Sequence, residues 1–518
     1  MRRLLKFSVL LAVLAAAIAL RIYFWGGAIP ARFRIVAAPP QPSSSPAEWT
    51  IEREPESAGP PRPQGAGDPH AEYWTARDTD GDGTWDEFIT PQGRFARPDD
   101  RMPPQRWLIV CLDGMPLAAM QSLWDRGHFR EFFRPTATIS TLPSDTETAL
   151  TEALHAPPVP GYEHLYFNRA ANSLRGGVWV TLTGIGIPYI RALDYDAPGW
   201  AKIIPYIVTR KTYQADVGRF RADFLASRAK VFVAHIASSD ALLHVTPMNN
   251  AEPLLLEFEN ALADIYLNSR GRVGVIAFSD HGNDRTLSRG SPIENFLGTR
   301  GWRVRGSIDG PRDVAIPAYG LVGFAAIYCR PAAIERLADQ LRAVEGADVI
   351  ISRHPNQANA VTIRSAGSSA SAELSWTADA ADVPVRAIRY RYIMLDGDPL
   401  GLASVFNSLH AAGKLDADGF AADADLFAAA SSGDFPDAAA RIRGWATNHV
   451  QNRADILVSL RPGYYHGRPW FGQVVQLTGT HGSLEKTSSL GFAMATYRLP
   501  SAVRLSDLIP ASLRDDSQ

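Results

Sequence analysis

Beyond the first hundred residues, short apolar runs alternate with amphipathic stretches along the chain. The runs Leu108–Leu112, Lys230–Ile236 and Val273–Phe278 have the length of strands and are almost continuously apolar. Residues Thr146–Leu154 and Glu252–Leu267 have the spacing of helices. Continuously apolar strands are typical of sheets that helices cover on both faces. The pattern therefore predicts an α/β fold with a largely parallel central sheet flanked by helices.

Between about residues 300 and 470 the pattern changes. The apolar run Phe324–Tyr328 is followed by a helix-like stretch, Ile334–Val344, and then by two alternating stretches, Ala360–Arg364 and Ala372–Trp376. Alternation of apolar and polar residues indicates strands with one buried face. We therefore expect a smaller α+β region inserted at 301–470, which divides the α/β core into residues 105–300 and 471–518.

The N-terminus has the charge pattern of an exported protein. Basic residues precede an apolar run at 7–20, which ends at Arg21. A cleaved signal and an uncleaved anchor both fit this pattern. Because no A-x-A cleavage site follows and residues 22–25 extend the apolar run, we expect residues 1–30 to anchor the chain in a membrane, with its bulk on the periplasmic or other extracytoplasmic side. Residues 31–75, rich in Pro, Ser and Gly, are expected to form a linker.

The overall composition excludes few classes of protein. Of the 518 residues, 46% are hydrophobic and 20% are charged, and the net charge is −2 with a sequence pI near 6.6. These values are ordinary for a globular protein, and without a basic excess we predict no binding to nucleic acid. The two cysteines, Cys111 and Cys329, form no C-x-x-C motif, and Cys111 is expected to be a small buried hydrophobe in its strand.

An acidic segment lies within residues 76–104. Asp78, Asp80 and Asp82 alternate with other residues, a glycine occupies the sixth place of the segment, and Asp86 follows. This spacing matches the first half of an EF-hand calcium loop, although Ile89 stands at position twelve, where such loops have glutamate. A separate calcium site and a simple polar turn explain the spacing equally well.

Aspartate follows each of the three predicted core strands or lies close behind it, two of these strands also have a histidine nearby, and one further histidine lies in a Thr-His-Gly motif far downstream. These residues are Asp113, Asp240, His244, Asp280, His281 and His481. In open parallel sheets ligands bind beyond the carboxyl ends of the strands, so residues that are distant in sequence can converge there. Three carboxylates and three imidazoles form a mixed donor set that suits two zinc-like ions.

The order of these motifs resembles the alkaline phosphatase superfamily and, within it, the type I phosphodiesterase/nucleotide pyrophosphatase branch. From Trp107 to Leu490, the apolar strand before Asp113 is followed by Leu142–Thr146, which resembles the family's Phe-Pro-x-x-Thr. Asp-x-x-x-His, Ser-Asp-His-Gly and Thr-His-Gly then follow in the family order, and Gly397–Gly401 also resembles a segment of this branch. The ordered set is specific, whereas each motif alone is common.

The resemblance implies an alkaline-phosphatase-like fold that hydrolyses phosphate esters, foremost phosphodiester or pyrophosphate bonds, through a phospho-threonine. The cofactors would be two divalent ions, Zn²⁺ or alternatively Mn²⁺, and the substrate a small phosphate ester or one derived from a lipid or nucleotide. The first ion would be held by Asp113, Thr146, Asp280 and His281, and the second by Asp240, His244 and His481. Thr146 would be the nucleophile, and Asn168 would donate a hydrogen bond to a phosphate oxygen.

The chemistry that the family performs explains these residue types. Two ions about 4 Å apart can hold the attacking and leaving oxygens of an in-line displacement. A threonine hydroxyl is a poor nucleophile at neutral pH unless its pKa is lowered by a metal. The N-terminus of a helix beneath it adds partial positive charge, which favours phosphate.

The segment before the predicted helix offers more than one hydroxyl. Thr141 precedes the proline by two residues, as in some spellings of the family motif, but aligning Leu142–Pro143 with Phe-Pro places Thr146 on the nucleophile and keeps the apolar helix in register. Thr146 also falls in the first helical turn, and either Ser144 or Asp145 can cap the helix, with Ser144 the better candidate. Asp145 would oppose an anionic substrate if it pointed into the site, and would be harmless as a cap.

The chain departs from the family pattern after this helix. His155-Ala156 stands where the family usually has Thr-Gly, and Glu163-His164-Leu165 stands near the place of the family His-Gly. These differences concern the geometry of the loop and the substrate more than the metal ligands.

Three other functions are alternatives to a phosphate-ester hydrolase. A sulfatase needs Cys or Ser in a Cys/Ser-x-Pro-x-Arg context, which neither cysteine has. A transferase that passes the phospho group to a membrane-derived alcohol would use the same residues. A non-catalytic surface protein would have no need for a complete set of ligands. The sequence does not choose among diester, pyrophosphate, phosphonate and monoester substrates.

Overall fold

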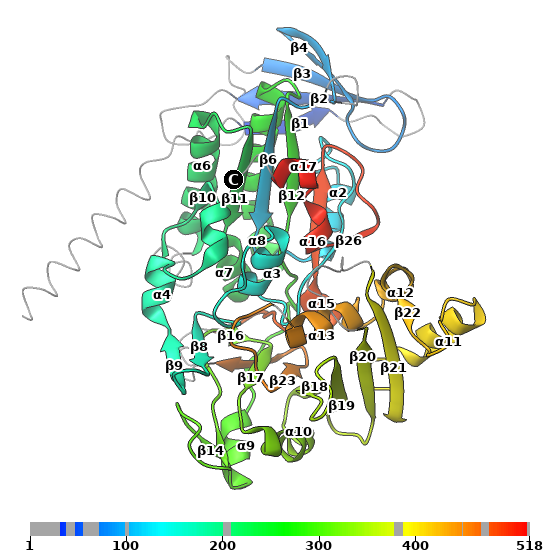
Figure 1. The fold of residues 1–518 in the computed structure, drawn as a ribbon. Helices are drawn as coiled ribbons and strands as arrows, with labels where there is room; N and C mark the ends of the chain where they lie inside the picture. The colour runs from blue at the N-terminus through cyan, green and yellow to red at the C-terminus, as the bar shows by residue number, and fades with distance from the viewer. Residues whose placement is uncertain are drawn as a thin grey trace, which may run out of the picture.

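The computed structural model describes residues 32–37, 47–54, 72–98, 103–199, 209–377, 387–447, 449–467 and 476–514. Their centre is a seven-stranded sheet in the order β10-β11-β6-β12-β25-β7-β26 (Figure 1). Its strands are β10 (Tyr195–Asp196), β11 (Val231–Ile236), β6 (Arg106–Leu112), β12 (Val273–Phe278), β25 (Leu490–Ala495), β7 (Thr136–Ile139) and β26 (Ala502–Arg504). Among these seven strands β25 alone is antiparallel to its neighbours. The predicted largely parallel sheet is therefore confirmed.

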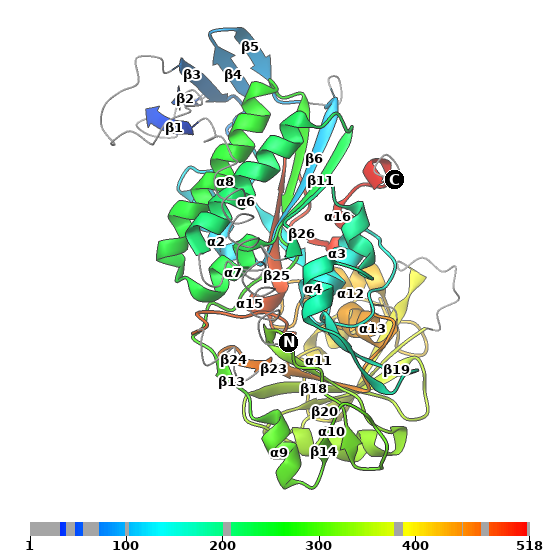
Figure 2. The same cartoon turned by 90° about the vertical axis from the view of Figure 1, so that its left-hand side faces the viewer.

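The central strands are continuously apolar because both faces of the sheet are covered. Leu108 and Val110 of β6 belong to the core that includes α2 (Leu117–Asp125), α6 (Thr209–Ala226) and α8 (Met248–Asn268). Ile109 and Cys111 point into the opposite core, which includes α3 (Thr146–Ala153). Figure 2 shows α6 and α8 on one face of the sheet and α3 on the other. Cys111 is buried, as predicted.

A second seven-stranded sheet lies within the range expected for the insertion (Figure 1). Its order is β17-β23-β18-β19-β20-β21-β22, and every pairing in it is antiparallel. The strands are β17 (Phe324–Ile327), β23 (Ile456–Leu460), β18 (Ala347–Arg353), β19 (Ala360–Ser365), β20 (Ser371–Trp376), β21 (Arg389–Asp396) and β22 (Ala421–Ala422). The helices are α10 (Ile334–Leu341), α11 (Ala403–Ala411), α12 (Asp423–Ala430) and α13 (Ala438–Thr447). The α+β insertion is confirmed, and its sheet has as many strands as the central one.

The remaining elements are short and lie between these layers or after the last strand. They are β8 (Leu165–Asn168), β9 (Ser173–Gly176), α4 (Val178–Thr183), η1 (Pro188–Ala192), α7 (Ser238–Val245), β13 (Arg289–Gly290), α9 (Ile293–Thr299), β14 (Arg303–Val304), β15 (Asp313–Val314), β16 (Leu321–Val322), η3 (Pro331–Ala333), β24 (Tyr464–Gly467), α15 (Lys486–Ser489), α16 (Leu505–Leu508) and α17 (Ala511–Arg514).

The N-terminal region contains a five-stranded antiparallel sheet, which the sequence did not predict. Its strands are β1 (Arg32–Ala37), β2 (Ala47–Glu54), β3 (Glu72–Asp78), β4 (Glu87–Thr90) and β5 (Gly93–Ala96). The linker expected at 31–75 therefore does not hold for the residues of β1, β2 and β3. Trp74 and Phe88 pack against Tyr266 and Leu267 of α8, so this sheet shares a small apolar core with the central domain. Pro-rich flanks concealed the short alternating pattern of β2, in which Trp49 and Ile51 lie two residues apart.

The predicted membrane anchor at 1–30 lies outside the described residues. Within the parts of the chain that the structure describes, no helix combines the length and the apolar character needed to cross a membrane.

One buried ion-pair cluster joins the central sheet to the insertion. Arg504 of β26 donates from Nη1 to Asp423 Oδ2 at 2.6 Å and from Nε to Asp437 Oδ2 at 2.6 Å. Both aspartates are buried, at 2% and 3% exposure. Two carboxylates therefore depend on one guanidinium in a region from which water is excluded.

Replacing this guanidinium should destabilise the fold strongly. We expect Arg504→Leu to lower the free energy of unfolding by about 3–5 kcal/mol, because it removes the guanidinium to which both buried carboxylates are bonded. Denaturant-induced unfolding measures the change. Lys414→Leu, which breaks the exposed pair between Lys414 and Asp425, is the control and should cost less than about 1 kcal/mol. Equal losses in the two variants would show that the cluster does not stabilise the fold.

Candidate metal centre

The parallel strands bring the predicted acidic and histidine residues to one edge of the central sheet. Asp113 follows β6 directly, and Asp280 lies two residues beyond β12. The third strand, β11, leads into α7, which was not predicted and which carries Asp240 and His244 one helical turn apart. His481 reaches the same edge from the loop before α15. The convergence expected from the sequence is therefore present.

The first group of ligand-type residues contains Asp113, Asp280 and His281. Their donor atoms lie within 4.8 Å of one another, and all three residues are buried. His281 Nε2 lies 3.4 Å from Asp113 Oδ1 and 3.4 Å from Asp280 Oδ2. Thr146 Oγ1 lies 3.4 Å from Asp113 Oδ1 and 3.4 Å from His281 Nε2. The structure thus places the predicted nucleophile against this group.

The second group contains Asp240, His244 and His481. His244 Nε2 lies 3.1 Å from Asp240 Oδ2, and His481 Nε2 lies 3.8 Å from Asp240 Oδ1. His281 connects the two groups, because its ring stacks on that of His481 at 3.8 Å between centroids, and its donor atom also lies within 4.8 Å of those of Asp240 and His481. Two candidate metal-binding groups therefore lie side by side.

Hydrogen bonds to the backbone fix the orientation of all three imidazoles. Nδ1 of His244 bonds to the Gly479 carbonyl at 2.8 Å, and Nδ1 of His281 to the Gly282 carbonyl at 2.9 Å. Nδ1 of His481 bonds to the Ser144 carbonyl at 3.0 Å. A carbonyl can only accept, so each Nδ1 carries the proton and each Nε2 is available as a metal ligand.

The close approach of the two groups depends on Gly114. Its φ is +70°, in the left-handed region that favours glycine, and a Cβ atom there would lie 2.6 Å from Asp240 Oδ1. Gly114 also donates its N–H to Asp280 Oδ1 at 3.1 Å. Any side chain at this position would push Asp240 away from the strand end.

The electrostatics of the cluster favour a bound cation. Burial, reinforced by the neighbouring Asp280, raises the pKa of Asp113 to about 7. Burial together with the stacked His281 lowers the pKa of His481 to about 3, so this imidazole is neutral. Burial alone would raise the pKa of Asp240, but the imidazole of His244 outweighs burial and lowers it below its usual range.

Two carboxylate oxygens in this cluster lack a hydrogen-bond partner among the described residues. They are Asp240 Oδ1 and Asp280 Oδ2, one in each group, and both are buried. A buried carboxylate oxygen without a partner is costly unless a cation offsets it. Oxygen and neutral imidazole donors are also the ligand types of zinc. The residues present therefore fit two divalent ions.

Thr146 is the first residue of α3. Asp145 caps the helix, because its Oδ1 accepts from the Thr148 N–H at 3.0 Å. Of the two predicted candidates, Asp145 is the cap and the preferred Ser144 is not. Ser144 instead donates its hydroxyl to the Ser483 carbonyl at 2.8 Å, and its own carbonyl holds His481. As a helix cap, the Asp145 carboxylate is in the arrangement expected not to oppose an anionic substrate.

The structure does not bring Asn168 to this cluster. Asn168 ends β8, where its Oδ1 accepts from the Ala171 N–H at 2.8 Å and closes the turn to β9. Near the other end of this strand, His164 Nε2 lies 3.1 Å from Glu147, the residue after the predicted nucleophile. Four residues of strand span about 13 Å, which explains why only His164 approaches the nucleophile helix.

A histidine that sequence analysis did not single out supports the first group. His235 of β11 is buried, with Nε2 2.9 Å from Asp113 Oδ2 and Nδ1 3.1 Å from Asp196 Oδ1. Burial opposes its protonation, but Asp113 and Asp196 outweigh burial and raise its pKa to about 10. Because His235 bonds to Oδ2, Oδ1 of Asp113 remains available to the cluster. The available signal was one ionisable residue inside the apolar run 231–236.

Comparison with protein-family models and with curated proteins gives no match. Solved structures do resemble the chain. Phosphonoacetate hydrolase from Sinorhizobium meliloti 1021, in complex with phosphonoformate, is 13% identical with a TM-score of 0.44, covering 83% of this chain and 98% of that chain. Murine ectonucleotide pyrophosphatase/phosphodiesterase 5 is 12% identical with a TM-score of 0.39, covering 78% and 93%.

The acidic segment forms a loop between β3 and β4, away from this cluster. Ligand oxygens of Asp78, Asp80 and Asp86 lie within 4.8 Å of one another. Asp82 is instead paired with Arg498 at 2.7 Å. Asp78 also accepts from the N–H groups of Gly81 at 2.7 Å and of Gly83 at 2.8 Å, as in a polar turn. The structure brings three of the four predicted calcium residues together, and the calcium site stays a prediction.

Calcium should raise the melting temperature if this loop binds it. We expect Asp80→Ala to remove the response, because it removes one of the three clustered carboxylates, the exposed one. Turnover at the separate cluster should not change. Thermal unfolding with and without calcium measures the response, with Asp82→Ala as the control that should keep it. A melting temperature that ignores calcium would leave only the polar turn.

Proposed function

We propose that the chain is a two-metal hydrolase of phosphate esters, acting on phosphodiester or pyrophosphate bonds, with Thr146 as the nucleophile. The observation that carries the proposal is the position of Thr146 Oγ1, at 3.4 Å from both Asp113 Oδ1 and His281 Nε2. A hydroxyl on the first residue of a helix, next to a buried cluster of carboxylates and imidazoles, has the surroundings of an activated nucleophile.

The two groups divide the ligands as follows. One ion would be held by Asp113, Thr146, Asp280 and His281, and the other by Asp240, His244 and His481. Zinc in these positions would lower the pKa of the hydroxyl and offset the charge of the phosphate oxygens.

The chain's own residues perform the remaining tasks. The Thr146 hydroxyl gives up its proton to solvent, and Oγ forms a bond to phosphorus while the bond to the leaving oxygen breaks. A water oxygen then bonds to phosphorus, the Oγ–P bond of the phospho-threonine breaks, and Oγ regains a proton. The first turn of α3 directs backbone N–H groups and partial positive charge at the phosphate. Asp145, by capping the helix through Thr148, holds Thr146 at its first position.

Removal of the Thr146 hydroxyl tests the nucleophile. We expect Thr146→Ala to lower turnover of an aryl phosphodiester by about three powers of ten, as in other enzymes that lose a covalent nucleophile. Thr146→Ser should keep part of the activity, because it keeps a hydroxyl. Steady-state kinetics with metal-loaded protein measures both.

Thr141→Ala is the matched control in the same segment. The Thr141 hydroxyl is buried and bonded to the Pro143 carbonyl at 2.8 Å and to the Thr148 hydroxyl at 2.7 Å, so it does not face the cluster. Turnover should change little. Near-normal turnover of Thr146→Ala, or a trapped phospho-enzyme that maps to another residue, would contradict the assignment.

A further inference from the structure

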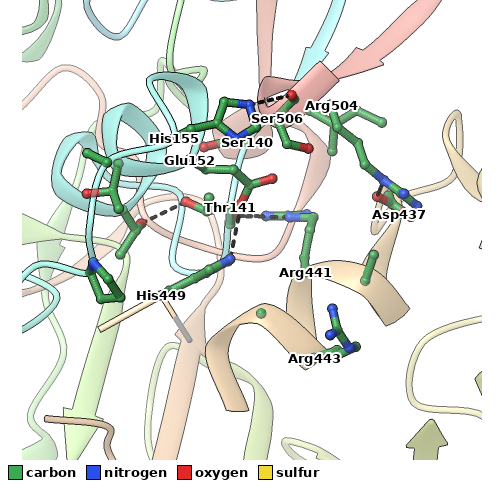
Figure 3. A pocket seen from close by; sticks show the side chains of 17 residues that line it. Ser140, Thr141, Glu152, His155, Asp437, Arg441, Arg443, His449, Arg504 and Ser506 are labelled. Atoms are coloured by element: carbon green, nitrogen blue, oxygen red, sulfur yellow. Dashed lines mark hydrogen bonds and ion pairs between the residues drawn. The ribbon is translucent and has the colours of Figure 1, made fainter. Parts of the chain in front are cut away.

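A cavity of about 320 Å³ lies behind the helix that carries Thr146 (Figure 3). Thr148, Thr151, Glu152 and His155 line it from one face of α3 and the turn that follows. Helical residues are about 100° apart, so Thr146, two positions before Thr148, lies on the other side of α3. The opposite wall comes from α13 and the floor from the ends of β7 and β26. The cavity is therefore separate from the metal cluster, at the junction of core and insertion, where ligand sites are frequent.

The lining of the cavity has more arginines than carboxylates. Three arginines and two histidines face Glu152 and Asp437. The carboxylates have partners already, since Asp437 is bound by Arg504 and Glu152 by His449 at 3.1 Å.

Arg441 carries a buried charge that no carboxylate bonds. Its guanidinium donates to the carbonyls of Thr141, Pro436 and Leu484 and to the Ser489 hydroxyl, all neutral acceptors. Arg441 is 4% exposed, and burial lowers its pKa to about 10. An anion in the cavity would be attracted by this charge.

Two polar atoms on the cavity wall have no hydrogen-bond partner among the described residues. They are Ser140 Oγ and His449 Nδ1. Ser140 is only 2% exposed, and His449 bonds Glu152 through its other ring nitrogen. Buried polar groups normally have partners. A hydroxyl is a donor, which a ligand with acceptor oxygens would satisfy.

We propose that this cavity binds a phosphate group, either free or as a small monoester, with Ser140 as a donor and Arg441 as the buried counter-charge. Its volume exceeds that of inorganic phosphate alone and leaves room for the alcohol part of a monoester. The ligand would lie beside Thr141, whose carbonyl receives two bonds from Arg441. The site does not depend on the proposed catalytic function.

Calorimetry on the full, metal-loaded chain tests the proposal. Inorganic phosphate and glycerol phosphate should each bind at a site that survives addition of a chelator, whereas any binding at the metal cluster should be lost. The tighter of the two ligands identifies the free or the esterified form. Ser140→Ala should weaken the chelator-resistant site about tenfold, as expected for one hydrogen bond to a charged ligand. Its folding should not suffer, because Ser140 Oγ has no protein partner to lose.

Two further variants separate the site from general effects. Ala440→Leu, on the cavity wall, should fill the space and abolish this binding. Ser375→Ala removes a second buried hydroxyl without a partner, in β20 and outside the cavity, and should bind phosphate as the parent does. Absence of any chelator-resistant binding, or binding unchanged in both Ser140→Ala and Ala440→Leu, would overturn the proposal. Loss of the chelator-sensitive site alone would concern only the metal cluster.

Discussion

The structure depends on the need to offset three carboxylates that are held close together away from water. Asp113, Asp240 and Asp280 meet at the carboxyl edge of the central sheet, where like charges repel strongly because the surroundings screen them poorly. Protonation relieves part of this repulsion, as the raised pKa of Asp113 shows. Divalent ions would relieve all of it. The glycine after Asp113 and the backbone bonds to each Nδ1 are arranged so that the ligand atoms converge in spite of the repulsion.

The insertion contributes to this site without supplying a ligand-type residue to either group. Gly323, just before β17, donates its N–H to the His481 carbonyl at 2.5 Å, and Ser459 of β23 accepts from the Leu484 N–H at 2.9 Å. From α13, Arg441 holds the Thr141 carbonyl on the segment that leads to the nucleophile. The second sheet therefore fixes the loop of His481 and the approach to Thr146. A change in the insertion could alter the centre without touching a ligand.

The sequence predicted the parts of the molecule that depend on local patterns. The apolar runs of β6, β11 and β12 have the length and composition of buried parallel strands, and the residue types that follow them identified the cluster. Tertiary contacts determined what was missed. His235 lies inside a strand that is apolar as a whole, and only the fold shows that it faces Asp113. The role expected for Asn168 came from motif spacing, which could not show that the strand β8 carries it away from α3. The strands β1 and β2 escaped notice because their flanks are rich in proline.

The central claim is that two divalent ions occupy the edge of the sheet. Crystals of the metal-loaded protein, measured above the zinc absorption edge, test it most directly. The account predicts two zinc peaks about 4 Å apart, one among Asp113, Asp280 and His281 and the other among Asp240, His244 and His481. A single peak, or none in zinc-saturated crystals, would contradict it.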